Sequence, residues 1–329
     1  MWYSAIGSIF MLVLSLLTTP HGAEAQQTAK ASRIGILCAV KCSGSPLTDG
    51  FRQRLRELGW LEGSTISIDT RAAEGQLERL PDLASELLQL NVDVLVAISA
   101  TTVVPAAKAT TSVPVVFFGV SDPVKLGIVR SLAHPGGNVT GFTYTASYEY
   151  FGKQLEFLKM AVPQLRRVSV IYDLQESRPN WWPILEQAGR ALNVDIAPPL
   201  RVRGPETFQD AIAQSARMRS GGVIVTSAST TYNYRELLTE QLLRARLPSI
   251  AGLREFAEAG GVLSYGINLR AVAMRLAEYV DRILRGAQPG DLPVEQPTTF
   301  ELVINLKTAK AMGLTIPPSL LARADQVIE

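Results

Sequence analysis

The stretch VDVLVAISAT, from Val92 to Thr101, decides how this chain is organised. It begins with a mostly apolar run of the length of a buried strand and ends with the hydroxyl residues that often begin helices. The same order recurs in GGVIVTSAS, from Gly221 to Ser229. A strand followed at once by a helix predicts a βα unit of a parallel sheet.

Further strands and helices alternate around the first stretch. Apolar runs predict four strands, and helical spacing of apolar residues predicts helices over 49–58 and 80–90, with a short helix ending before Pro114. The expected strands are Arg33–Leu37, Ile66–Thr70, Val92–Ile98 and Val115–Phe118. Alternating strands and helices require parallel pairing with right-handed crossovers, so the fold class is α/β with a doubly wound sheet.

This order is then repeated along the chain. VSVIY at 168–172 matches RIGIL at 33–37, and LPSIAG at 247–252 matches VPVVFFG at 113–119. Ile34 and Val168 are separated by 134 residues, Ser99 and Ser227 by 128, and Pro114 and Pro248 by 134. Near-constant offsets over three strands predict two similar Rossmann-like lobes in series.

The stretch HPGGNVTGF, from His134 to Phe142, lies between these lobes. Its glycines have the spacing of a phosphate-binding loop, but Phe142 stands where that loop requires lysine. We therefore interpret NVTGFTYT as a strand that carries the chain from one lobe to the other, with Gly136, Gly137 and Gly141 serving a turn and a flexible exit.

Composition excludes several classes of protein. The chain has 32 Lys and Arg against 30 Asp and Glu, dispersed without a basic stripe, so nucleic acid is not an expected partner. An apolar run over 5–17 followed by Ala23, Glu24 and Ala25 predicts a signal peptide over 1–25, although no Lys or Arg precedes the run. No later segment is long and apolar enough to span a membrane. We expect a soluble, periplasmic, monomeric protein.

Recognisable catalytic parts are missing from the sequence. After the predicted signal peptide His134 is the one histidine, and no nucleophile elbow, zinc motif or dinucleotide fingerprint is present. Cys38 and Cys42 have no second cysteine pair for a four-ligand metal site, and they form either a local disulfide or two reduced, partly buried thiols. The sequence thus predicts no enzyme, metal or cofactor.

Candidate ligand-binding residues follow from the geometry of parallel sheets, which bind ligands beyond the carboxyl ends of their strands. Helix capping is the simpler role for each of these residues, but equivalent loops in two lobes favour a shared site, in which Asp122 or Asp173 would hold an ammonium group. The predicted loop residues are Ser43, Ser45, Ser99, Ala100, Thr101, Ser121, Asp122, Asp173, Asn180, Ser227 and Ser229. The predicted residues of aromatic and interlobe segments are Tyr144, Trp181, Tyr265 and Asn268, with one of Trp181 and Trp182 in the core.

Several longer strings carry a family resemblance. They are ELGWLEGSTISID from Glu57, FFGVSDPVKLGIVRSLAHPGGNVTGFT from Phe117, FAEAGGVLSYGINL from Phe256, and the run from Tyr279 to Glu329 that includes FELVINLKTAKAMGL. From about Arg33 to its end the chain resembles ABC-transporter substrate-binding proteins of the tryptophan/tyrosine-binding type, with the type I periplasmic binding protein fold. The loop AVKCSGSP and the Trp181–Trp182 pair depart from the family pattern, which leaves the ligand open.

The resemblance implies a solute receptor that closes two lobes around a small carboxylated ligand, such as an aromatic amino acid, and works with an ABC permease in the inner membrane. The expected lobes are 30–143 with about 267–292, and 144–266 with about 293–329, joined by a hinge that the chain crosses three times. A ligand-sensing partner of a membrane receptor and a secreted hydrolase remain alternatives. A transcription regulator is disfavoured, because a DNA-binding segment would stand where the signal peptide stands.

Overall fold

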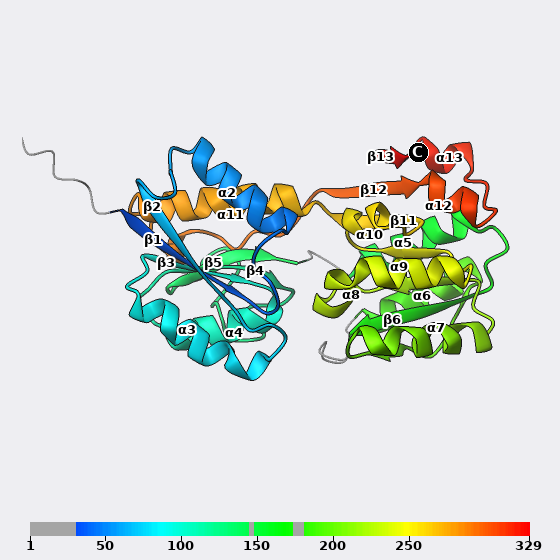
Figure 1. The fold of residues 1–329 in the computed structure, drawn as a ribbon, viewed down its shortest axis with the longest axis horizontal. Helices are drawn as coiled ribbons and strands as arrows, with labels where there is room; N and C mark the ends of the chain where they lie inside the picture. The colour runs from blue at the N-terminus through cyan, green and yellow to red at the C-terminus, as the bar shows by residue number, and fades with distance from the viewer. Residues whose placement is uncertain (1–30, 145–147, 174–180) are drawn as a thin grey trace, which may run out of the picture. The chain divides into compact units, whose positions relative to one another are not determined.

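The structure, a computed structural model, describes residues 31–144, 148–173 and 181–329, apart from the side chain of Ser229. The predicted signal peptide and Asn180 therefore lie outside the described residues. From Ser32 onward the chain contains two sheets, each covered by helices on both faces (Figure 1). None of the described helices is long and apolar enough to cross a membrane.

The first sheet is entirely parallel and has the strand order β2-β1-β3-β4-β5. Its strands are β1 (Ser32–Cys38), β2 (Ile66–Ala72), β3 (Val94–Ile98), β4 (Val115–Val120) and β5 (Val139–Thr143). Its helices are α2 (Pro46–Glu57), η1 (Leu77–Arg79), α3 (Leu80–Gln89), α4 (Ala100–Ala109) and α11 (Leu269–Leu284). The predicted strands and helices of this half of the chain are present, with ends shifted by a few residues.

Alternation along the strands divides the core of the first sheet into two layers. Ile34, Ile36 and Val94 pack beneath α2 and α11, which lie side by side. Leu37 and Leu95 point to the opposite face, beneath α3 and α4. Because a strand exposes alternate side chains to alternate faces, a sheet buried on both faces needs the continuous apolar runs that the sequence contains.

The stretch at 139–143 is a full strand of the first sheet and not simply a connector between lobes, which corrects our interpretation. β5 pairs in parallel with β4, and Gly141 lies opposite Phe117 with φ of 151°. A β-carbon at Gly141 would lie 2.1 Å from the Phe117 carbonyl oxygen. The glycine therefore permits close strand pairing, and the chain leaves the lobe only after Thr143.

The second sheet has the order β13-β12-β11-β10-β9-β6-β7, with β8 also paired to β6. Its strands are β6 (Arg167–Asp173), β7 (Asp195–Ile196), β8 (Leu200–Val202), β9 (Gly222–Val225), β10 (Ser249–Ala251), β11 (Leu263–Ile267), β12 (Phe300–Asn305) and β13 (Gln326–Ile328). β12 runs antiparallel to β11, and the other pairs are parallel.

Helices cover both faces of the second sheet as well. α5 and α6 share one core layer, whereas α7 and α9 share the other. The helical segments are α5 (Glu149–Ala161), α6 (Trp182–Leu192), η2 (Pro205–Thr207), α7 (Phe208–Arg217), α8 (Ser229–Asn233), α9 (Arg235–Arg244), α10 (Arg254–Glu258), α12 (Leu306–Ala311) and α13 (Pro318–Leu321). The short helix η3 (Pro289–Asp291) instead contacts β5 of the first sheet.

The chain passes between the two sheets three times. It leaves the first sheet after β5, returns after β11 to form α11 against α2, and leaves again before β12 (Figure 1). Before the last passage the Glu295 N–H donates to the Gly141 carbonyl oxygen at 3.0 Å. The α/β fold with two doubly wound lobes and a multi-crossover hinge is therefore confirmed.

Candidate functional site

Most of the predicted loop residues lie at the carboxyl ends of the parallel strands. In the first sheet they follow β1, β3 and β4, and in the second they follow β6 and β9. Because parallel strands end at one edge of their sheet, each lobe brings its loops together at that edge. The individual residues nevertheless have different roles.

Ser99 has the least ordinary backbone of these residues. Its φ of 107° and ψ of 154° place it in a region that only glycine enters readily. Its hydroxyl does not cap α4 but lies 2.9 Å from the Thr101 hydroxyl, while the Thr102 hydroxyl donates to the Ser99 carbonyl oxygen at 2.9 Å. Backbone strain concentrates where proteins bind ligands, and Ala100, the exposed first residue of α4, keeps this helix start open.

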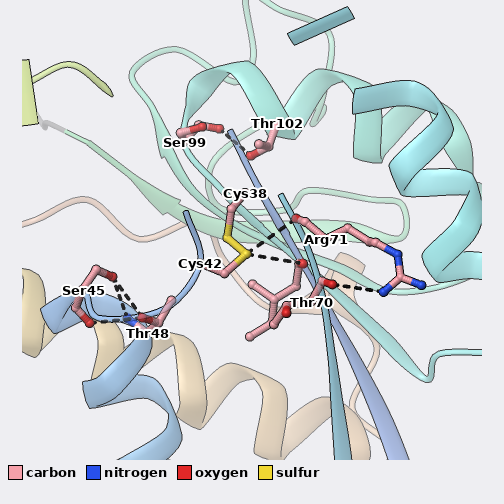
Figure 2. Close-up of a disulfide and its surroundings, with 9 residues drawn as sticks. Cys38, Cys42, Ser45, Thr48, Thr70, Arg71, Ser99 and Thr102 are labelled. Carbon is pink, nitrogen blue, oxygen red and sulfur yellow. Dashed lines mark hydrogen bonds between the residues drawn. A yellow bond between two sulfur atoms is a disulfide. The ribbon is translucent and has the colours of Figure 1, made fainter. Parts of the chain in front are cut away.

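The loop after β1 is closed by a disulfide between Cys38 and Cys42, whose Cα atoms are 5.5 Å apart (Figure 2). Both cysteines are buried. Ser45 caps α2, since its Oγ accepts the Thr48 N–H at 3.2 Å, whereas Ser43 is exposed on the loop. Figure 2 shows the disulfide between the Ser45 helix start and the Ser99 loop.

The two carboxylates predicted to hold an ammonium group both bind backbone N–H groups. Asp122 is exposed, follows the half-buried Ser121, and accepts the Lys125 N–H at 2.9 Å. Asp173 is fully buried and accepts the Thr230 N–H at 3.0 Å, near the start of α8. Both carboxylates therefore accept a backbone N–H as capping groups do, which was the simpler role for each.

Ser227 takes part in a convergence of polar groups on Gly252. The Ser227 hydroxyl accepts the Gly252 N–H at 3.1 Å. A β-carbon at Gly252 would lie 2.9 Å from Ser227 Oγ, 3.4 Å from Tyr144 Oη and 3.6 Å from Gln154 Nε2. Three segments therefore meet at this glycine: the residue after β5 that carries Tyr144, the helix α5 and the loop after β9. The loop after β9 leads directly into α8, which begins at Ser229.

The remaining predicted residues pack into the second lobe or cap a helix. Trp181 is buried, with its ring 4.7 Å from Phe151, so it is the tryptophan of the pair that joins the core. Half-buried Tyr265 stacks on Phe300 with ring centroids 5.8 Å apart. Asn268 caps α11 through the Ala271 N–H and donates to Glu301 at 3.1 Å.

Two residues that sequence reasoning missed lie at the same edge of the second sheet. Glu255, the second residue of α10, is 5% exposed, and its Oε2 atom has no hydrogen-bond partner. The hydroxyl of Tyr232 in α8 is also buried without a partner. Burial raises the pKa of Glu255. Burial of the Tyr232 hydroxyl, together with the negative charge of Glu255, raises the pKa of Tyr232 to about 12. The only sequence signal was a glutamate two residues after the apolar stretch LPSIAGL, with Arg254 between them.

In 31–144, 148–173 and 181–329 no group of three His, Cys, Asp or Glu residues stands close enough to share a metal ion. The site offers hydroxyls, an amide, a buried carboxylate and a phenol. Such groups bind and orient a small polar molecule.

The sequence profile of the family described as ABC transporter substrate binding protein matches residues 34–328. The chain belongs to this family. Substrate-binding proteins are not enzymes; they bind small ligands, work with ABC permeases and typically act in the periplasm or outside the cell. The type I periplasmic binding protein fold that the sequence predicted is confirmed as well.

Known relatives of this substrate-binding protein include aromatic amino acid binders. A tyrosine-binding protein of Clostridioides difficile (strain R20291) is 26% identical over 269 residues, which are 80% of this chain and 76% of that protein. A conserved domain protein from Vibrio cholerae O1 biovar El Tor has a TM-score of 0.81 at 27% identity, covering 91% of this chain and 100% of the other. An ABC domain from Streptococcus pneumoniae in complex with L-Trp has the same TM-score and coverage at 23% identity, which shows the shared fold.

Proposed function

We propose that the chain is an exported solute-binding protein of an ABC importer, which closes its two lobes around one small carboxylated ligand such as an aromatic amino acid. Closure of two lobes about a crossover hinge is a common motion of this architecture. The C. difficile relative, named as a tyrosine-binding protein, supports an aromatic ligand.

The observation that carries the proposal is the strained Ser99 at the carboxyl end of β3. Its hydroxyl is directed to Thr101 and not to the helix N–H groups. The Thr102 N–H donates to the Ser99 carbonyl oxygen at 3.2 Å, whereas the N–H groups of Ala100 and Thr101 have no acceptor within the helix. Hydroxyl and N–H donors at a helix start bind a carboxylate well, because charge-assisted hydrogen bonds are the stronger ones. Ser227 occupies the equivalent position in the second lobe.

A thermal-shift screen of the purified protein tests this function. The compounds are amino acids, aromatic acids, small dicarboxylates and, as an uncharged set, sugars. A ligand at 100 times its Kd is expected to add about 2.7 kcal/mol to the free energy of unfolding. A hit among carboxylated compounds supports the proposal. Stabilisation by uncharged compounds alone, such as sugars, contradicts it, and turnover of a hit would instead identify the hydrolase alternative.

A further inference from the structure

The loop that joins β1 to α2, residues 39–45, is bonded to the rest of the protein mainly at its two ends. At its start the Ala39 carbonyl oxygen accepts the Gly75 N–H at 3.0 Å, and at its end Ser45 caps α2. Between these points the backbone of residues 40–44 forms no hydrogen bond within the described part of the chain. The disulfide from Cys42 to Cys38 is therefore the bond that holds this segment in place.

The disulfide lies inside the core of the first lobe. Cys38 and Cys42 are 4% and 7% exposed, and both belong to the apolar layer that also contains Leu47 and Phe118. The Arg71 carbonyl oxygen lies 3.5 Å from Cys42 Sγ and is placed to accept an S–H donor there. A reduced Cys42 thus has a hydrogen-bond acceptor in the same position, so the lobe accommodates both redox states.

The disulfide is also next to the loop that we assign to the ligand carboxylate. Cys38 is the last residue of β1 and pairs in register with Ile98 of β3. Ser99, with its strained backbone, follows Ile98 directly. Figure 2 shows the disulfide beside the Ser99 loop. A change at the disulfide therefore acts directly beside this part of the candidate site.

We propose that the disulfide between Cys38 and Cys42 is a redox switch, through which the oxidised protein binds its ligand more tightly than the reduced protein does. The inference rests on the proposed function. A dithiol supplies the two electrons. Its own two thiols are oxidised to a disulfide, the bond between Cys38 and Cys42 breaks, and the two protons of the dithiol end on the two cysteine sulfur atoms.

Reduction weakens binding because it releases residues 40–44. Without the covalent bond this segment samples more conformations, and a ligand at this edge has to order it again at a cost in entropy. The two cysteines are 4 residues apart in the sequence, so the bond constrains this loop and no larger part of the lobe. The effect is therefore local to the strand ends that carry the candidate site.

Ligand binding and reduction then oppose each other. A ligand that binds the oxidised protein more tightly must disfavour reduction by the same factor, because the coupling of two equilibria is reciprocal. Burial of both cysteines has a related kinetic effect, since a thiolate reaches the sulfur atoms only when the loop opens. A ligand that holds the loop closed should therefore also slow its reduction.

Titration calorimetry with L-tyrosine and L-tryptophan measures this coupling on oxidised and on dithiothreitol-reduced wild type. The Cys38→Ala, Cys42→Ala double variant is the control, because it has no bond on which dithiothreitol can act. Maleimide labelling counts free thiols at fixed ratios of dithiothreitol to its disulfide, with and without each amino acid at saturation. Hydrogen exchange follows residues 39–45 and 99–101, and far-UV circular dichroism reports whether each form is folded.

We expect reduction to weaken the binding of at least one of the two amino acids on the order of tenfold. The double variant should bind as the reduced wild type does, with or without dithiothreitol. The same amino acid should lower the ratio of reduced to oxidised wild type by the same factor, and hydrogen exchange at 39–45 and 99–101 should become faster on reduction.

Two results would overturn the switch and leave the proposed function standing. One is a reduced protein that binds as tightly as the oxidised protein, with a redox ratio that the amino acid does not change. The other is loss of the folded circular dichroism signal on reduction, which would make the disulfide a structural bond of the whole lobe. Absence of binding of both amino acids to every form would overturn the switch and the proposed function together.

Discussion

The Ser227 hydroxyl accepts the Gly252 N–H at 3.1 Å and thereby ties the loop after β9 to the loop after β10. The two strands are neighbours in the second sheet, so their loops emerge side by side. Tyr144 and Gln154 approach the same glycine from the crossover strand and from α5. Polar groups from three separate parts of the chain therefore surround Gly252.

A side chain at Gly252 tests whether these polar groups belong to the ligand site. In Gly252→Ala the new β-carbon would lie 2.9 Å from Ser227 Oγ, which forces the hydroxyl to move. We expect ligand affinity to fall by more than tenfold, and the free energy of unfolding to fall by about 1–3 kcal/mol through overpacking. Calorimetry and urea unfolding measure the two effects. Gly137→Ala is the control, because a β-carbon there meets nothing within 4 Å, and equal effects of both variants on affinity would contradict the assignment.

Ser99 offers a test in which stability and binding change in opposite directions. Its φ of 107° strains any side chain, at a cost of about 1–3 kcal/mol. Ser99→Gly should therefore raise the free energy of unfolding while it weakens ligand binding, because the hydroxyl is lost. Ser99→Ala should weaken binding equally without the gain in stability. Urea unfolding and calorimetry on both variants give the comparison, and unchanged affinity in both would remove Ser99 from the site.

Loss of the equivalent hydroxyls in both lobes measures their joint contribution. The double variant Ser99→Ala with Ser227→Ala should weaken binding of a carboxylated ligand by about 1–3 kcal/mol for each charge-assisted bond lost. Ser85→Ala is a suitable control, since its exposed hydroxyl only donates to the Pro81 carbonyl oxygen. Titration calorimetry gives the difference, and a double variant that binds as tightly as the control would show that these loops hold no ligand.

The fold could be predicted because buried strands have an unambiguous pattern. VLVAI at 94–98 has no polar face, so it requires cover on both sides, and the recurrence of this pattern at 221–229 predicted a second sheet. The role of 139–143 was predicted less well, since a glycine inside a strand resembles a glycine in a turn. Only the close approach of Gly141 to Phe117 distinguishes the two.

The site could be predicted only to the level of loops. Residues after β3 and β9 follow from sheet geometry, but Ser, Thr and Asp cap helices as readily as they bind ligands. Asp122 and Asp173 engage backbone N–H groups, whereas Glu255 keeps a free oxygen. Whether a carboxylate is paired depends on residues far away in the sequence, as in the ion pair between Arg254 and Glu301. The sequence alone does not show which residues come together in this way.

The disulfide between Cys38 and Cys42 closes a small loop, so we expect it to make a small contribution to the free energy of unfolding. A chain-entropy treatment gives about 2 kcal/mol for a loop of this size. We expect dithiothreitol to lower the free energy of urea unfolding of wild type by this order, and to have no effect on the Cys38→Ala, Cys42→Ala double variant. A wild-type protein that is indifferent to the reductant would show that the two thiols are unpaired.

The pH dependence of stability reports on Glu255 without any ligand. Burial raises the folded-state pKa of its carboxyl above the unfolded value. The charge of Glu258 raises this pKa further, whereas a backbone hydrogen bond and the charges of Arg235 and Arg254 lower it. The stability that this group contributes is therefore present below the unfolded pKa, near 4.5, and is lost as pH rises through the folded pKa. Glutamine does not titrate, so Glu255→Gln should become more stable relative to wild type between pH 4 and pH 7.

The matched control for this measurement has the opposite sign. A hydrogen bond from Arg54 lowers the pKa of Glu57, whose stabilising contribution is present above its unfolded pKa and is lost at lower pH. Glu57→Gln should therefore lose stability relative to wild type at pH 7. The free energies of urea unfolding of wild type, Glu255→Gln and Glu57→Gln are measured at pH 4 and pH 7. The contributions of all other titrating groups cancel in the difference between each variant and wild type. A Glu255→Gln protein that loses stability at pH 7, as the Glu57 variant does, would mean that the Glu255 carboxylate is paired in the folded state.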